Sequence, residues 1–70
     1  MRLLRLDNGL LQLELTGDQL AAFSNGLNEA LNAVEDWEFR TRLGVDRDAA
    51  RGWLSELRVL ERQVEQCGDA

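Results

Sequence analysis

The sequence contains no histidine and no lysine, and its only cysteine is Cys67. Without histidine the commonest acid-base group of enzymes is missing, and a zinc site would have to combine one thiolate with carboxylates. A single cysteine cannot form an internal disulfide, and no companion base accompanies it. We therefore expect a non-catalytic protein with no metal or other cofactor.

Long apolar runs are also absent. The start, MRLLRLDNGL, reaches an acidic turn before any signal-peptide core, and no stretch approaches the roughly 20 apolar residues of a membrane span. We therefore expect a cytoplasmic protein without a membrane segment. Its 70 residues allow one small domain, 1–66, with a frayed tail at 67–70. At this size a single core is marginal, so self-association is an expected source of stability.

Acidic residues outnumber basic ones by 13 to 8, and the formal net charge is −5. An acidic surface favours a basic partner and opposes binding to a polyanion such as DNA. All the basic residues are arginines, which suit fixed bidentate contacts, so we expect structural or interfacial roles for some of them. Codon usage in a GC-rich genome is the simpler and favoured explanation for the use of arginine in place of lysine.

The N-terminal segment has the pattern of a β-hairpin. Asn8 and Gly9, which tolerate the positive φ of a type I′ turn, separate two leucine-rich runs, and we expect strands at about 2–7 and 10–16. Because two strands alone are marginal and leave unpaired edges, we expect a homodimer in which two hairpins form a four-stranded sheet. The predicted cross-strand pairs are Leu4 with Leu13, Leu6 with Leu11, Arg2 with Leu15 and Arg5 with Gln12.

After residue 16 the apolar spacing lengthens to three or four, which predicts an amphipathic helix over 17–34. Thr16 and Gln19 have the pattern of a capping box. The opposite face repeats Asn25, Asn28 and Asn32, an amide stripe that fits either a polar contact surface or a solvated face. The predicted buried stripe is Leu20, Phe23, Leu27, Leu31 and Val34.

The segment EDWEFRTRLGV predicts a short helix over 36–43 that ends at Gly44 as its C-cap. Phe39 and Leu43 are one turn apart and should point inward. Trp37 lies off this stripe, so it either completes the core, the commoner role, or anchors a partner at the surface.

A last helix is predicted over 46–66, with Asp46 as N-cap and Gly68 beyond its end. The predicted fold class is therefore α+β, with an N-terminal β-hairpin packed on two long helices and a short helix between them. The buried stripe of the last helix should contain Ala50, Trp53, Leu54, Leu57, Leu60 and Val64.

Residues 38–57 also fit a helix-turn-helix DNA reader, which is the alternative function. Arg47 and Arg51 would reach the DNA, but Asp46 and Asp48 would face the same phosphates, and the segment lacks a basic footprint. The residues that match the template are Leu43, Gly44, Val45, Ala50 and Trp53, while Arg40 replaces the usual Ala.

Residues 27–57 resemble a group of small bacterial proteins with an Leu-Asn-Glu segment, a Glu-Phe-x-Thr-Arg-Leu-Gly-Val segment and a closing amphipathic helix. No activity is established for that group, so the resemblance implies no catalytic residues. The matching residues are Leu27, Asn28, Glu29, Glu38, Phe39, Thr41, Arg42, Leu43, Gly44 and Val45.

Size, acidity and the lack of catalytic groups together favour a protein-binding module that occupies a basic partner protein. An immunity or inhibitor protein of a bacterial conflict system is the most concrete form of this hypothesis. We expect the partner surface on the polar side of the first helix and on the short helix. Its predicted residues are Asn25, Asn28, Glu29, Asn32, Trp37, Glu38 and Arg42.

Overall fold

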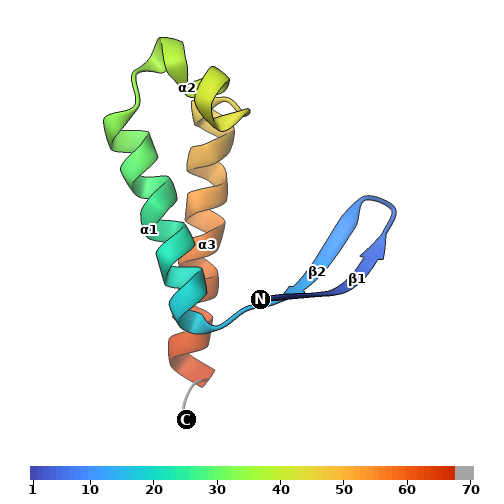
Figure 1. Ribbon diagram of the computed structural model, residues 1–70. Coiled ribbons are helices and arrows are strands. Elements are labelled where there is room, and N and C mark those ends of the chain that lie inside the picture. The colour runs from blue at the N-terminus through green and yellow to red at the C-terminus, as the bar shows by residue number, and fades with distance from the viewer. Residues whose placement is uncertain (68–70) are drawn as a thin grey trace.

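The computed structural model describes residues 1–67 (Figure 1). It confirms the α+β class and the predicted order of elements. The long helices α1 and α3 lie side by side in opposite directions, and α2 joins them at one end. The elements are β1 (Arg2–Asp7), β2 (Leu10–Glu14), α1 (Gly17–Ala33), α2 (Asp36–Leu43) and α3 (Arg47–Cys67).

The ends of the predicted elements differ slightly from the observed ones. The second strand ends at Glu14, two residues early, and α1 ends at Ala33. Asp46 precedes α3, and its backbone carbonyl accepts the first hydrogen bond of that helix from Ala50. Cys67 belongs to α3, whereas the remainder of the predicted tail and Gly68 lie outside the described residues.

The hairpin turn has the predicted conformation, but the strand register changes halfway along. Asn8 and Gly9 have φ angles of 52° and 78°. Near the turn, the predicted pairs Leu6 with Leu11 and Arg5 with Gln12 are confirmed. Farther from it, Leu13 pairs with Leu3 rather than Leu4, and Arg2 pairs with Glu14 rather than Leu15.

An irregularity between Leu3 and Arg5 causes this shift. The extra residue, Leu4, moves Arg2 opposite Glu14, where the two side chains form an ion pair at 3.4 Å. Residues opposite one another in a sheet point to the same face. The shifted register therefore moves Arg2 away from the face that carries most of the leucines and places it on the face of Glu14. One face of the hairpin, here called the leucine face, carries Leu3, Leu6, Leu11 and Leu13.

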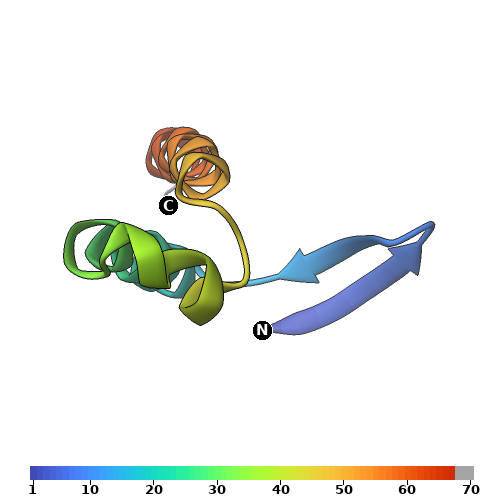
Figure 2. The ribbon, with the colours of Figure 1, turned by 90° about the horizontal axis from the view of Figure 1, so that it is seen from above.

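The hairpin does not pack on the long helices, contrary to the prediction. Figure 2 shows that it extends away from both of them, and within residues 1–67 only its base, at Leu13 and Leu15, borders the helical pair. The connection is short, since only Leu15 and Thr16 separate β2 from α1, and a capping box closes the start of the helix. The Thr16 hydroxyl accepts a hydrogen bond from the Gln19 amide at 3.0 Å, and the Gln19 side chain accepts one from the Thr16 amide at 2.9 Å.

The core of the described chain is small. Leu20 and Ser24 of α1, Phe39 of α2 and Ala50 of α3 are its only buried residues. Small side chains bring α1 and α3 together, and a Cβ atom at Gly17 would lie 3.4 Å from Val64. Phe39 is buried as predicted.

Much of the predicted core is instead exposed. Leu43 lies at the surface, and Trp37 is 79% exposed, so the core role of this tryptophan is wrong. The side of each long helix that contacts the other helix is rotated about the helix axis from the centre of its apolar stripe. Part of each stripe therefore stays uncovered, and α2 is too short to cover it. About half of the surface of four further predicted core residues is therefore accessible: Phe23, Trp53, Leu60 and Val64.

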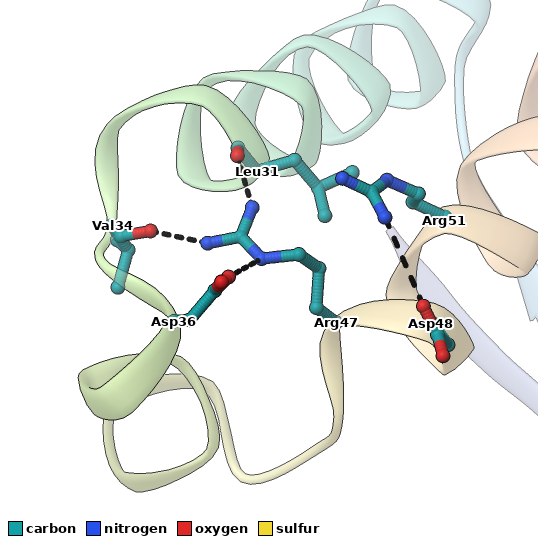
Figure 3. Close-up of polar contacts among 6 residues, drawn as sticks. All are labelled: Leu31, Val34, Asp36, Arg47, Asp48 and Arg51. Carbon is teal, nitrogen blue, oxygen red and sulfur yellow. Dashed lines mark hydrogen bonds and ion pairs between the residues drawn. The ribbon is translucent and has the colours of Figure 1, made fainter.

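Arg47 joins the three helices at the end opposite the hairpin (Figure 3). Its guanidinium donates hydrogen bonds to the backbone carbonyls of Leu31 and Val34, which α1 leaves free at its C-terminal end. It also forms an ion pair with Asp36, with Nε 2.6 Å from the carboxylate, and lies 4.7 Å from the centre of the Phe39 ring. A single side chain from the start of α3 thereby fixes the end of α1 and the start of α2.

Candidate functional site

The predicted partner surface divides into two parts in the structure. Along α1, Asn25 accepts a hydrogen bond from Arg58 at 3.3 Å, and Asn28 is half-buried. Glu29 is exposed on the same helix. The amide stripe is thus partly used within the fold, because Asn25 already binds α3.

The second part lies where α1 meets α2. Here Asn32 and Trp37 line one shallow hollow, together with Glu35, Asp36 and Arg51. The aromatic ring and the amide come from different helices, and the turn at residues 34–35 places them next to each other. This hollow combines a large apolar anchor with a hydrogen-bonding amide and with charged groups of both signs, since Arg47 lines it as well.

Glu38 and Arg42 occupy α2 one turn apart and bind each other, with 2.9 Å between their charged atoms. Arg42 is exposed and Glu38 is half-buried. Neither lines the hollow of Trp37. The pair stabilises the short helix and leaves Glu38 only partly available to a partner.

A second surface, which the sequence prediction missed as a site, is apolar. In α3, Trp53, Leu57, Leu60 and Val64 recur at intervals of three and four and therefore line one side of the helix. A groove on this side is lined by Leu57, Leu60 and Val64, by Leu20 of α1 and by Leu13 and Leu15 at the base of the hairpin.

Both helices contribute to the same face. Phe23 follows Leu20 by one turn, and the exposed stripe of each helix is displaced in the same rotational sense from the line of contact. In an antiparallel pair, this displacement brings the two stripes to one side. We call this surface the apolar face; it comprises Leu20, Phe23, Trp53, Leu57, Leu60 and Val64. The repeated leucines suggested a core, and only the packing angle could show that the stripe was uncovered.

The charged residues of the predicted helix-turn-helix motif form contacts within the fold. Arg47 points into the fold and its side chain is only 17% exposed. Asp46 pairs with Arg40 at 2.6 Å, so its carboxylate faces α2. Arg51 is exposed and lies 3.8 Å from Asp48. Of the two arginines proposed to reach DNA, only Arg51 has a side chain that is accessible to another molecule.

Residues 1–67 contain no group of three or more His, Cys, Asp or Glu side chains that could hold a metal ion. Over the same residues, no helix is both long and apolar enough to cross a membrane.

No protein-family model matches the chain, and neither a curated protein nor a solved structure gives a significant match. The resemblance carried by residues 27–57 remains a prediction.

Proposed function

We propose that this chain is a small acidic, non-catalytic binding module that occupies a basic partner protein in the bacterial cytoplasm. The observation that carries the proposal is the position of Trp37, which is 79% exposed on α2 although the neighbouring core is sparse. Tryptophan is among the residue types that dominate binding energy when a partner covers them. A ring that contributes little to folding is available for that role.

The surroundings of Trp37 support a polar, charge-guided contact. Asn32 lines the same hollow and offers both a donor and an acceptor. Glu29 and Glu35 are exposed nearby in the sequence and add negative charge to a chain whose formal charge is −5. Such a field raises the association rate of a basic partner and weakens with added salt.

The remaining predicted residues form the edges of the proposed surface. Asn25 and Asn28 extend it along α1, and Glu38 and Arg42 extend it along α2. Because Glu38 and Arg42 are paired, their contribution is smaller than that of Trp37. An immunity or inhibitor protein, which blocks a basic toxin or enzyme by covering it, is the class that this combination fits best.

Cytoplasmic action is supported by the cysteine content. Cys67 is a free, exposed thiol, as is common in proteins of reducing compartments.

The proposal is tested by placing a photo-crosslinking amino acid at position 37 and identifying the protein that it captures in bacterial cells. The captured protein should be basic, and when purified it should bind the wild-type chain at a rate that falls with salt. Trp37→Ala should weaken this binding by at least about 10-fold, as expected for a hot-spot residue, with the melting temperature unchanged.

Charge reversal provides the matched control. Glu29→Lys lies on the proposed surface and should slow association, whereas Glu65→Lys, at an exposed position near the far end of α3, should have a smaller effect. Equal effects of the two reversals would show that the partner responds only to the net charge of the chain and not to the proposed surface. Unchanged binding by Trp37→Ala would overturn the proposed surface.

A further inference from the structure

The chain exposes more surface than a folded monomer of its size. A compact monomer of 7.9 kDa has about 4,400 Å² of accessible surface by the usual scaling with mass, whereas this chain exposes 5518 Å². Its radius of gyration is 13.8 Å, compared with about 11 Å for a compact domain of this length. The excess of about 1,100 Å² is larger than the roughly 800 Å² that each partner buries in a standard stable interface.

Two exposed apolar surfaces contribute to this excess. The first is the leucine face of the hairpin, and all strand residues are exposed. The second is the apolar face of α1 and α3. The two surfaces meet only at the base of the hairpin, around Leu13, because the strands extend away from the helices of their own chain (Figure 2).

We propose that a second copy of the chain covers both surfaces. In a two-fold symmetric dimer, the leucine face of each hairpin lies on the apolar face of the other copy. Each contact buries one leucine face and one apolar face, and the two-fold axis generates a second, identical contact. This inference concerns self-association and does not depend on the basic partner or on Trp37.

The leucine face is long enough to cover much of the apolar face. On β1 it runs from Leu3 to Leu6 and spans roughly 10 Å at about 3.4 Å per step. The stripe from Trp53 to Val64 on α3 spans roughly 17 Å, at about 1.5 Å per residue. The leucine face of one copy therefore reaches along more than half of the apolar face of another.

The charges also permit this contact. The hairpin contains Arg2, Arg5, Asp7 and Glu14, so its side chains carry no net charge, and the whole deficit of −5 resides in the rest of the chain. Arg2 pairs with Glu14 and Arg5 with Asp7, on the side opposite the leucine face. A neutral arm approaches an acidic helical pair without the repulsion that two acidic bodies would meet.

The arrangement differs from the four-stranded sheet expected from the sequence. Pairing of strand edges would satisfy backbone groups, but it would leave the leucine faces and the apolar faces of both copies in water. Burial of apolar surface is the larger driving force. Exchange of hairpins onto helices is therefore the arrangement that accounts for the excess surface.

The first experiment uses two neighbouring leucines that point to opposite faces of β2. Leu11 belongs to the leucine face, whereas Leu10 lies opposite Asp7 on the other face. Light scattering of the wild-type chain at micromolar concentration should give about twice the mass of 7.9 kDa. Leu11→Lys should weaken dimerisation by at least about 10-fold because it places a charge in the apolar contact, and Leu10→Lys should change it less than about twofold.

A wild-type chain that remains a monomer, with a stability independent of concentration, would overturn the dimer. Equal dimerisation by both lysine variants would overturn the contact through the leucine face. Circular dichroism shows whether each variant retains its helices, so that loss of dimer is not confused with unfolding.

The second experiment locates the contact without a disruptive charge. One chain carries Leu11→Cys, another carries Leu60→Cys, and both carry Cys67→Ser. When the two are mixed and oxidised, the proposed dimer gives a mixed disulfide between hairpin and α3 as the main product. Dimers linked only through two copies of the Leu11→Cys chain would instead support pairing of hairpins and overturn the proposed arrangement.

Discussion

Replacement of Arg47 should destabilise the fold more than replacement of any other arginine. In Arg47→Ala, the carbonyls of Leu31 and Val34 lose a charged donor, at a cost of about 1 kcal/mol each because water reaches part of this site. Loss of the contact with the Phe39 ring costs about 1 kcal/mol more. The ion pair with Asp36 adds little, since that carboxylate is 89% exposed.

The expected loss is therefore about 3 kcal/mol in the free energy of unfolding. For a chain of this size, such a loss lowers the melting temperature by roughly 12 to 24 °C. Urea denaturation at several fixed protein concentrations measures it and separates it from any change in self-association. Arg47→Lys should lie between wild type and Ala, because an ammonium group lacks the planar fork that reaches both carbonyls.

Arg51→Ala is the matched control, since Arg51 lies one turn farther along α3, is exposed and is 3.8 Å from Asp48. It should change stability by less than about 0.5 kcal/mol. If Arg47→Ala were no more harmful than Arg51→Ala, the assignment of Arg47 as the side chain that joins the three helices would be refuted.

Further substitutions test the packing of α1, the C-cap of α2 and the alternative function. Ser24→Ala should be neutral or stabilise the protein by up to about 1 kcal/mol in thermal unfolding, because the buried hydroxyl has no hydrogen-bond partner within residues 1–67. Gly26→Ala should stabilise α1 by up to about 1 kcal/mol, since a Cβ there meets nothing within 4 Å; a loss of stability would show that another molecule covers this position. Gly44→Ala should cost about 1 kcal/mol in the same assay because the residue has a φ of 78°. In a fluorescence titration at physiological salt, duplex DNA should bind no more tightly than about 10⁻⁶ M; a nanomolar complex weakened by Arg51→Ala would favour the helix-turn-helix function instead.

The local elements of this protein follow from its sequence because each depends on neighbouring residues. Asn8 and Gly9 accept the positive φ angles of the turn, and Thr16 with Gln19 closes the start of α1. Gly44 adopts the left-handed conformation that ends α2. These features need only backbone geometry and hydrogen bonds within a few residues, so their prediction required no knowledge of the packing.

Tertiary structure alone decided which apolar residues are covered. The spacing of Leu60 and Val64 predicts a stripe, but a stripe is buried only if a neighbour lies on it, and α1 contacts α3 along a rotated line. The direction of the hairpin likewise depends on one connection at Thr16, and the role of Arg47 depends on the end of α1 coming within its reach. Periodicity specifies which side of a helix is apolar, whereas the angle between elements determines whether that side becomes core or remains an open surface for another molecule.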